Sequence, residues 1–361
     1  GGWINAVIPI LIVPYYSVIG GWVIKYLYEY IIGNGGQLAS DGYFTGFISS
    51  GGSAEICFLI FTALTVAVIF GGVRNGIERV SKFMMPVLVI LSIMITAYSV
   101  TMPGALEGVK YFLIPNFSNF SWMTVVSAMG QMFYSLSIAM GILITFGSYM
   151  KKNVSIEKST TNVEIFDTGI AIMAGLMIIL AVFAFSGGNP DTLQAGPSLM
   201  FITLPKVFSG LSAGTFVFLV LCAALTSSIA LTESAVSTFQ DQLGWGRKKS
   251  TVIVTVIMIA LGTLSCLGYG PLGFAQILGM QMLDFFDFLT NSVMMPIAAI
   301  ATCLLVSRVV GVKKIEEEMT AENGTFKRKK IFNFMIKYLC PVFAAIILIS
   351  SVANAFGIIK M

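Results

Sequence analysis

The sequence contains no histidine and few charged residues. Histidine is the commonest metal ligand and the usual general base, so its absence argues against most zinc sites and most hydrolytic sites. Charged residues make up 11% of the 361 residues and hydrophobic ones 57%, whereas a soluble domain carries roughly 25% charged residues. A water-soluble globule cannot bury that much apolar surface. The long apolar runs predict an all-α polytopic membrane protein, because barrel strands would alternate in polarity.

Cysteine chemistry is also sparse. The five cysteines are scattered through apolar runs, and no CxxC pair occurs. Cysteine packs as a small hydrophobe, so buried free thiols are expected rather than a metal or redox centre. The chain opens on Gly1–Gly2 and a hydrophobic run without a basic region, so no cleavable signal peptide is expected.

Apolar runs of about 20 residues predict nine membrane spans. They cover residues 4–30, 54–72, 83–102, 121–149, 163–186, 212–240, 251–269, 280–307 and 332–357. Basic clusters follow only the even-numbered spans, and the alternate loops hold just Lys110 and Lys206. By the positive-inside rule, the first residue lies on the cytoplasmic side of the cell membrane and the C-terminus lies outside. The net charge of +4 follows from this topology, and no nucleic-acid partner is expected.

Ionisable residues inside spans are costly and therefore suggest function. Here they are Asp167, Glu233, Asp284 and Asp287. Lys25 and Glu29 lie one helical turn apart near the end of the first span and are interpreted as an interfacial pair.

Two of the connections expected on the outer side are long, at 104–120 and 187–211. The second is too apolar for a solvated loop. It is expected to fold back as short helices over an outward vestibule.

The sixth span contains the polar stretch ALTSSIALTES, residues 224–234. Thr226, Ser227 and the carbonyl of Ala223 could present several hard oxygen atoms to one sodium ion. The alternative is that these hydroxyls bond back to the preceding helical turn or join neighbouring helices. The stretch alone does not decide between them.

The fourth span contains GQMFYSLSIAMG, residues 130–141, with hydroxyls and small residues where a plain anchor would carry leucine. A helix broken here would expose backbone N–H and C=O groups, which is tolerated only where the backbone lines a cavity. Transporters build substrate and ion sites in this way. An unbroken helix with serines at a packing interface fits equally well.

Six motifs, in order along the chain, resemble the neurotransmitter:sodium symporter family, especially its bacterial amino-acid members. They are PYYSVIGGW (14–22), GGVRNGIERVSKFMMP (71–86), GQMFYSLSIAMG (130–141), FITLP (201–205), ALTSSIA (224–230) and LDFFDFLTN (283–291). The resemblance implies one transporter domain over 1–361 with a five-plus-five inverted repeat. Residues 1–103 would be the remnant of the first repeat, 121–307 the second, and 332–357 an additional helix. The family's first two helices have no counterpart here, so we expect the sequence to be N-terminally truncated.

The resemblance also implies roles for particular residues. Those expected at the substrate are Tyr16, Tyr134, Ser135, Ser137, Met140, Ser227 and Leu231. Those expected at sodium are Ser135, Asp167, Ala223, Thr226 and Ser227. Those expected at gates are Asp287 on the outer side, and Asp241 with Tyr149 on the inner side.

Asp167 stands where many relatives place an asparagine that binds sodium. A carboxylate adds a fixed negative charge, which animal relatives often obtain from chloride, so chloride is not expected to be required. The alternative is a carboxylate paired with another group.

The implied function is import of a small hydrophobic or aromatic L-amino acid, coupled to sodium, by alternating access. Neither an organic cofactor nor enzyme activity is expected. The alternatives are another carrier built on the same inverted-repeat plan, a non-transporting or regulatory membrane fragment, and an intramembrane enzyme.

Overall fold

The computed structural model describes residues 2–187, 189, 196–208, 210–320 and 326–357. Regular structure in this part of the chain is helical, apart from one isolated bridge between Ile277 and Met280. The α-helices are α1 (Gly2–Ile31), α2 (Gly35–Leu38), α3 (Tyr43–Ser49), α4 (Gly52–Phe70), α5 (Arg79–Thr101), α6 (Ala105–Leu113), α7 (Trp122–Ser135), α8 (Ile142–Ser148), α9 (Ile156–Ser186), α10 (Leu204–Val207), α11 (Gly210–Leu243), α12 (Arg247–Leu267), α13 (Met282–Asp287), α14 (Met295–Leu304), α15 (Val312–Thr320), α16 (Lys329–Phe334) and α17 (Cys340–Ala355).

Several π-helical segments occur, most of them within the membrane helices, and the sequence had not predicted them. These segments are η1 (Val73–Glu78), η4 (Leu199–Thr203), η5 (Phe288–Met294), η6 (Leu305–Val310) and η8 (Met335–Leu339). A short 3-10 turn, η2 (Phe117–Asn119), precedes α7. Because π-helical turns often lie at functional sites, η5 is notable, since it directly follows Asp287.

Eight of the nine predicted spans are confirmed as helices that are long and apolar enough to cross a membrane. They are Gly2–Ile31, Gly52–Phe70, Val73–Thr101, Ile156–Ser186, Ser212–Leu243, Arg247–Leu267, Met282–Val310 and Lys329–Ala355. The predicted fourth span at 121–149 differs, because it is divided into the two short helices α7 and α8.

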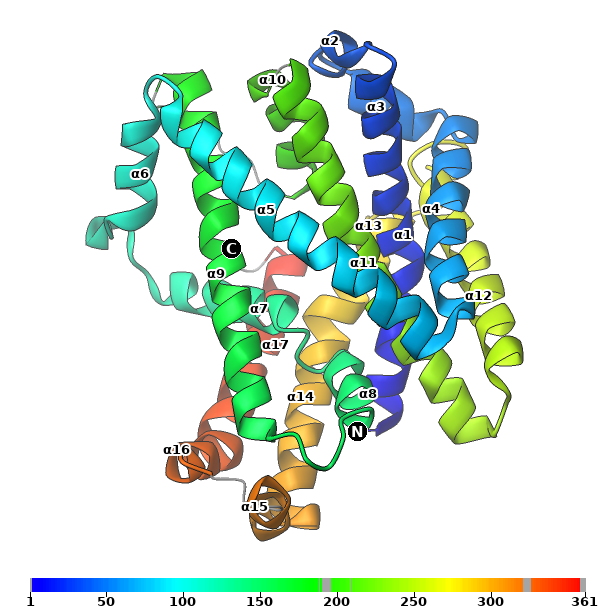
Figure 1. The fold of residues 1–361 in the computed structure, drawn as a ribbon, viewed down its shortest axis with the longest axis vertical. Coiled ribbons are helices and arrows are strands. Elements are labelled where there is room, and N and C mark those ends of the chain that lie inside the picture. Colours follow the sequence, from blue (N-terminus) through cyan, green and yellow to red (C-terminus); the bar gives the residue numbers. More distant parts are fainter. Residues whose placement is uncertain (1, 188, 190–195, 209, 321–325, 358–361) are drawn as a thin grey trace.

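Helix α1 forms the centre of the bundle, packed against α4, α11 and α12 (Figure 1). It is apolar around most of its circumference, as a helix buried on all sides should be. Gly20 and Gly21 allow α4 to approach closely. A Cβ added to Gly21 would lie 2.6 Å from the backbone nitrogen of Phe58, and one added to Gly20 would lie 2.4 Å from the Phe61 ring. Small residues at such crossings are typical of membrane helix packing.

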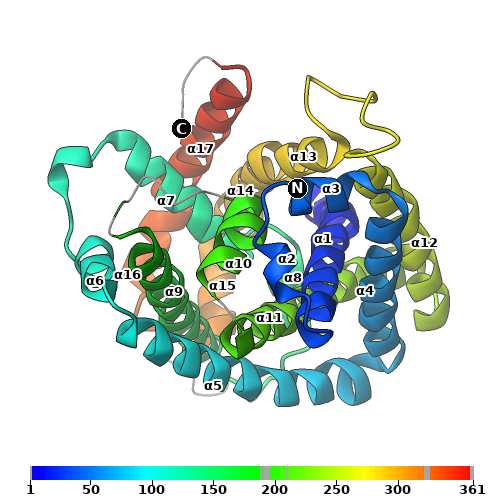
Figure 2. The same ribbon diagram turned by 90° about the horizontal axis from the view of Figure 1, so that it is seen from above.

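The remaining long helices enclose this centre. Figure 2 shows α5 lying along one side of the bundle, where it packs against α9 and α11. Figure 1 shows α2, α3 and α10 at one end of the molecule, and α8, α15, α16 and the start of α1 at the other. The two ends therefore separate the loops predicted to lie outside from those predicted to lie inside.

The apolar connection before α11 is confirmed as short helices, η4 and α10, within the residues described; positions 188, 190–195 and 209 lie outside them. The Tyr26 hydroxyl donates a hydrogen bond of 2.7 Å to the carbonyl of Phe201. The Phe201 ring stacks on Phe44 and meets Trp22 edge to face. The connection is thus fastened to the end of α1.

Two charged contacts occupy the same end of the molecule. The predicted pair of Lys25 and Glu29 is confirmed as an ion pair, and Asn34 donates a further hydrogen bond of 3.1 Å to Glu29. Lys206 of α10 pairs with Asp41, which follows α2. The neighbouring ammonium of Lys206 lowers the pKa of the Asp41 carboxyl.

Candidate functional site

The polar stretch in the fourth predicted span is a break between two helices. α7 ends at Ser135 and α8 begins at Ile142. In between, Ser137 and Ala139 adopt φ values of 53° and 60°, and Gly141 adopts 75°. Left-handed backbone is uncommon for residues other than glycine and costs of order 1–3 kcal/mol. The hypothesis of a broken helix is confirmed, and the alternative of a continuous helix is wrong.

The break lies beside an acidic residue of α9. The Ser135 hydroxyl donates a hydrogen bond of 2.6 Å to a carboxylate oxygen of Asp167. The two residues are 32 positions apart in the sequence, and their contact joins the end of α7 to the middle of α9. Asp167 is half-buried and Ser135 exposed. A carboxylate and a hydroxyl next to interrupted backbone form a set of hard oxygen atoms that suits a small cation.

Several aromatic residues gather between the break and α13. Tyr16 of α1 is half-buried, and its hydroxyl interacts with that of Ser227 on α11. Tyr134, at the end of α7, lies close enough to interact electrostatically with Tyr16 and Asp287. Asp287 is itself within hydrogen-bonding reach of Tyr15. The structure therefore brings together α1, α7, α11 and α13, which carry residues predicted at the substrate or at the outer gate.

The sixth predicted span, now α11, shows hydrogen bonds within its own helix. The Thr226 hydroxyl lies 3.1 Å from the carbonyl oxygen of Cys222 and 2.9 Å from that of Ala223. This is the bonding to the preceding turn that the sequence left open as an alternative. It also places the Thr226 and Ala223 oxygens side by side, while Ser227 is exposed. The Ser227 hydroxyl also interacts with that of Tyr16, so this group of oxygens lies next to α1.

Met140 and Leu231 are each only 4% exposed and belong to the same buried hydrophobic cluster. Met140 follows the left-handed residues of the break, and Leu231 lies one turn beyond Ser227. Both are thus apolar neighbours of the polar groups described above. The flexible thioether of methionine can adapt its shape to different ligands.

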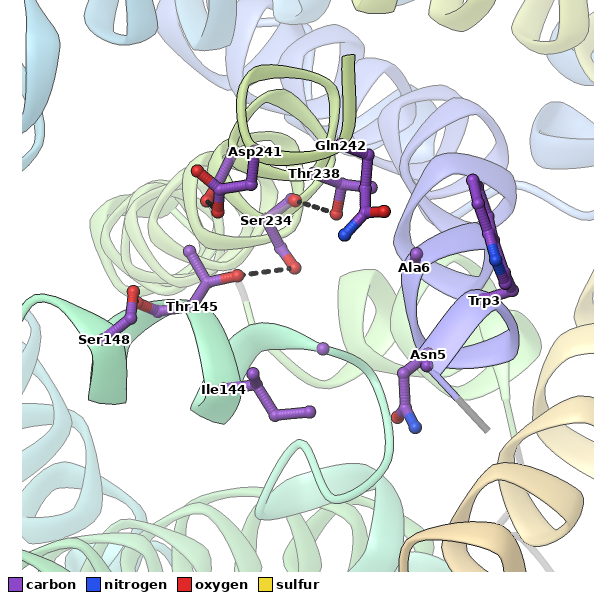
Figure 3. Close-up of a pocket in the computed structure, with 13 residues that line it drawn as sticks. Trp3, Asn5, Ala6, Ile144, Thr145, Ser148, Ser234, Thr238, Asp241 and Gln242 are labelled. Carbon is purple, nitrogen blue, oxygen red and sulfur yellow. Dashed lines mark hydrogen bonds between the residues drawn. The ribbon is translucent and has the colours of Figure 1, made fainter. Parts of the chain in front are cut away.

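Beside the break, at the end of the molecule where α1 begins, α1, α8 and α11 enclose a cavity of about 320 Å³ (Figure 3). Its lining is rich in hydroxyls, and Thr145 and Ser234 hydrogen bond across it at 3.2 Å. Asp241 stands at its rim, where it accepts a hydrogen bond of 3.3 Å from Ser237. Asp241, predicted at the inner gate, is thus exposed and available to a basic partner.

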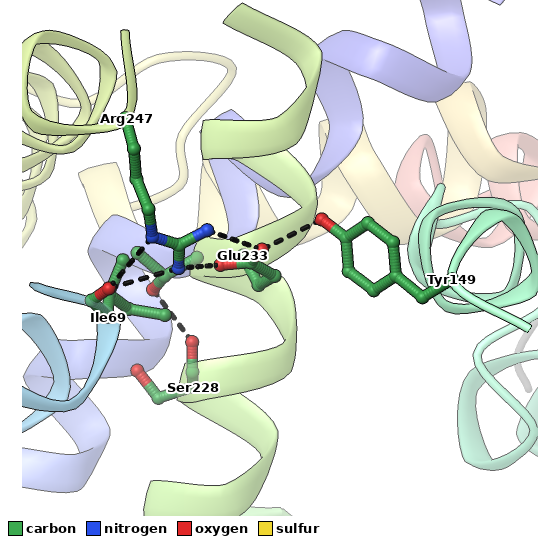
Figure 4. A network of polar contacts seen from close by, with 6 residues as sticks. Ile69, Tyr149, Ser228, Glu233 and Arg247 are labelled. Carbon is green, nitrogen blue, oxygen red and sulfur yellow. Dashed lines mark hydrogen bonds and ion pairs between the residues drawn. The ribbon is translucent and has the colours of Figure 1, made fainter. Parts of the chain in front are cut away.

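A second network lies next to this cavity (Figure 4). Glu233 of α11 is fully buried and forms two contacts with the Arg247 guanidinium, of 3.0 and 2.6 Å. Arg247 also donates to the carbonyl of Ile69, the last turn of α4, at 3.0 and 3.2 Å. The Tyr149 hydroxyl donates to Glu233 at 2.8 Å. One carboxylate therefore connects the residue that follows α8 with α11 and α12, while Arg247 adds α4.

Tyr149 was predicted at the inner gate with Asp241, and Arg247 was counted only among the basic residues that set the orientation. In the structure Tyr149 bonds directly to Glu233, while Ser237 interacts with both Tyr149 and Asp241. The signal for this network was present: an acid within a span calls for a partner, and Arg247 begins the next span along the chain.

We expect Gly141→Ala to destabilise the protein by about 1–3 kcal/mol, because alanine is strained at positive φ. Its Cβ would also lie 2.8 Å from the carbonyl oxygen of Asn5 and 3.0 Å from the Ser234 hydroxyl. The matched control is Gly147→Ala in α8, where nothing lies within 4 Å of the added atom. Thermal unfolding in detergent measures both variants. Equal midpoints for the two would contradict the strained break.

These features define a class: a polytopic helical membrane protein with polar groups gathered at an interrupted helix, as in secondary transporters. The profile of the sodium:neurotransmitter symporter family matches residues 44–358, and the chain belongs to this family. The resemblance stated from the six motifs is thereby confirmed.

Individual relatives agree. A sodium-dependent transporter of Bacillus subtilis, YhdH, is 33% identical over 99% of this chain and 80% of its own length. A sodium-dependent transporter of Haemophilus influenzae is 33% identical over 94% of this chain and 76% of its own length. The crystal structure of MhsT in complex with L-phenylalanine superposes with a TM-score of 0.84 at 32% identity, covering 97% of this chain and 80% of MhsT.

Proposed function

We propose that this sodium-dependent transporter is a symporter that imports a hydrophobic or aromatic L-amino acid. The inward sodium gradient drives the cycle, and helices rock between outward-open and inward-open arrangements. The sodium dependence is that of the family, whereas the direction of transport, the coupling to the sodium gradient and the class of substrate are proposed for this chain. The observation that carries it is the contact of Ser135 with Asp167 at the helix break.

Sodium would bind at two places. At the first, Asp167 and Ser135 supply a carboxylate and a hydroxyl beside the interrupted backbone. At the second, the Thr226 hydroxyl and the Ala223 carbonyl oxygen, 2.9 Å apart, would be two of the ligands. The exposed hydroxyl of Ser227 would be a third. The Asp167 carboxylate neutralises part of the cation's charge, so chloride is not needed.

The substrate would lie between α1, the break and α11. An amino acid is a zwitterion, whose carboxylate can help to ligate sodium and whose ammonium can meet carbonyl groups at a helix end. Tyr16 and Ser227 mark its polar end, with Ser137 at the break. Tyr134, Met140 and Leu231 surround its side chain. MhsT was crystallised with L-phenylalanine, a substrate that such an apolar lining suits.

The gates lie at the two ends. Asp287 would close the outer side, and Asp241 with Tyr149 the inner side, where the hydroxyl-lined cavity opens. The end that carries α8, α15 and α16 faces the cytoplasm, because the basic clusters gather there. Residues 121–307 form the complete second repeat and 1–103 part of the first.

The selectivity of the site can be tested with a panel of labelled amino acids. We expect L-phenylalanine and L-leucine to bind saturably in sodium and at least tenfold more weakly in potassium, while L-glutamate and L-lysine fail to bind. A charged side chain would be left unpaired against Tyr134, Met140 and Leu231. The panel is measured on the chain alone and joined behind the two N-terminal helices that the resemblance predicts for the family. Preferential binding of a charged amino acid would contradict the substrate class.

A further inference from the structure

Lys337 lies in an unusual place for a charged residue. It belongs to η8, inside the candidate span Lys329–Ala355. At 1.5 Å per residue it lies roughly 12 Å along the helix from Lys329. That span is the least buried of the eight, with 11% of its most apolar window inside the protein. Lys337 is exposed although it lies within this span, and an unpaired charge inside a span is costly.

The protein supplies no acid to Lys337 within the residues described. Neither Lys337 nor Arg308 of η6 forms an ion pair in this part of the chain. Two acids near this end already have partners. Glu164 pairs with Arg328 at 2.7 Å, and Glu316 pairs with Lys329 at 2.8 Å. Since no described acid lies within ion-pair distance of Lys337, a negative group from outside this part of the protein can take that place.

The surroundings of Lys337 combine positive charge with apolar surface. Elements η6 and η8 touch, so Arg308 and Lys337 belong to adjacent segments. Lys330, Phe334 and Lys337 recur at helical spacing and so share one face of their helix. The rings of Phe334 and Tyr338 are 57% and 63% exposed. In Figure 1, α16 lies beside α15 at the same end of the molecule as the N-terminus.

We propose that Arg308, Lys330 and Lys337 form a binding site for the headgroup phosphate of an anionic phospholipid. The acyl chains lie along the exposed rings of Phe334 and Tyr338. Basic pockets between membrane helices on the cytoplasmic side bind anionic headgroups in this way, and each lysine or arginine near the surface contributes about 1 kcal/mol. The lipid supplies the counter-charge that Lys337 lacks and can hold α14 and α17 together at their shared end.

The test is native mass spectrometry of the purified chain. The protein is equilibrated with equal amounts of phosphatidylglycerol and phosphatidylcholine bearing identical acyl chains. We expect preferential retention of phosphatidylglycerol. Lys337→Gln should lower that retention about fivefold, the equivalent of ~1 kcal/mol, while Lys337→Arg should preserve it. The control is Lys314→Gln, which removes an exposed charge from α15 outside the spans and should leave retention unchanged.

Three outcomes would overturn the proposal. One is equal retention of the two lipids by the unaltered chain. Another is an equal effect of Lys337→Gln and Lys314→Gln, which would show general charge attraction rather than a site. The third is displacement of phosphatidylglycerol by millimolar inorganic phosphate, which would assign the site to a soluble anion. Because Lys337→Arg keeps the charge, it separates loss of lipid binding from loss of folding.

Discussion

Replacing Asp167 by asparagine should lower the apparent sodium affinity about a hundredfold in chloride-free buffer. A unit charge about 4 Å from a cation is worth up to about 4 kcal/mol at an effective dielectric constant of 20, and the neutral amide retains part of that as a dipole. Asp167→Asn should also make binding chloride-dependent, because a bound anion can replace the missing carboxylate charge. Sodium titrations of substrate binding in chloride and in gluconate measure both effects.

The control for Asp167→Asn is Glu164→Gln on the same helix. Glu164 lies one turn away and pairs with Arg328 at the surface rather than with Ser135. The Glu164→Gln variant should therefore keep the sodium affinity and the chloride dependence of the unaltered protein. If Asp167→Asn binds sodium as the unaltered protein does in both salts, the carboxylate plays no part at the cation, and its bond to Ser135 is structural.

The second large effect is expected at the buried ion pair. Arg247→Met leaves the fully buried Glu233 carboxylate without its guanidinium. Removing one partner of a buried pair typically costs about 3–5 kcal/mol. The free energy of unfolding should fall by that amount, measured by chemical denaturation in detergent. The double variant Glu233→Gln with Arg247→Met removes both charges and should recover much of the loss.

The matched control is Arg328→Gln, which breaks the ion pair with Glu164. The side chains of Arg328 and Glu164 are both about half exposed, so the free energy of unfolding should change little. If the double variant is as unstable as the sum of the single variants, the pair is not energetically coupled, and Arg247 acts through its bonds to the Ile69 carbonyl instead.

Much of the fold was predictable because a membrane helix can be recognised from the length and hydropathy of its sequence. The same rule failed at 121–149, since composition cannot distinguish a continuous helix from two halves separated by Ser137, Ala139 and Gly141. The π-helical segments were also out of reach. Most of their sequences, such as that of η5 (FLTNSVM), mix apolar and polar residues as the neighbouring α-helices do.

The candidate site was only partly predictable from the residues themselves. An acid inside a span suggests a function, but its partner depends on how helices pack. Glu233 meets Arg247 because the chain reverses between α11 and α12, and it meets Tyr149 because α8 lies alongside α11. Ser135 and Asp167 were assigned to a common sodium by resemblance. Their contact shows that the fold brings them together, while the ion itself stays a prediction.

The most direct test of the account is reciprocal linkage between sodium and substrate. Equilibrium binding of L-phenylalanine is measured at increasing sodium, and sodium binding at increasing L-phenylalanine, on the chain joined behind the family's two N-terminal helices. Thermodynamic linkage requires each ligand to raise the affinity of the other by the same factor, and we expect a factor of at least ten. Saturable L-phenylalanine binding of equal affinity in sodium and potassium would contradict a sodium site coupled to the substrate at the helix break.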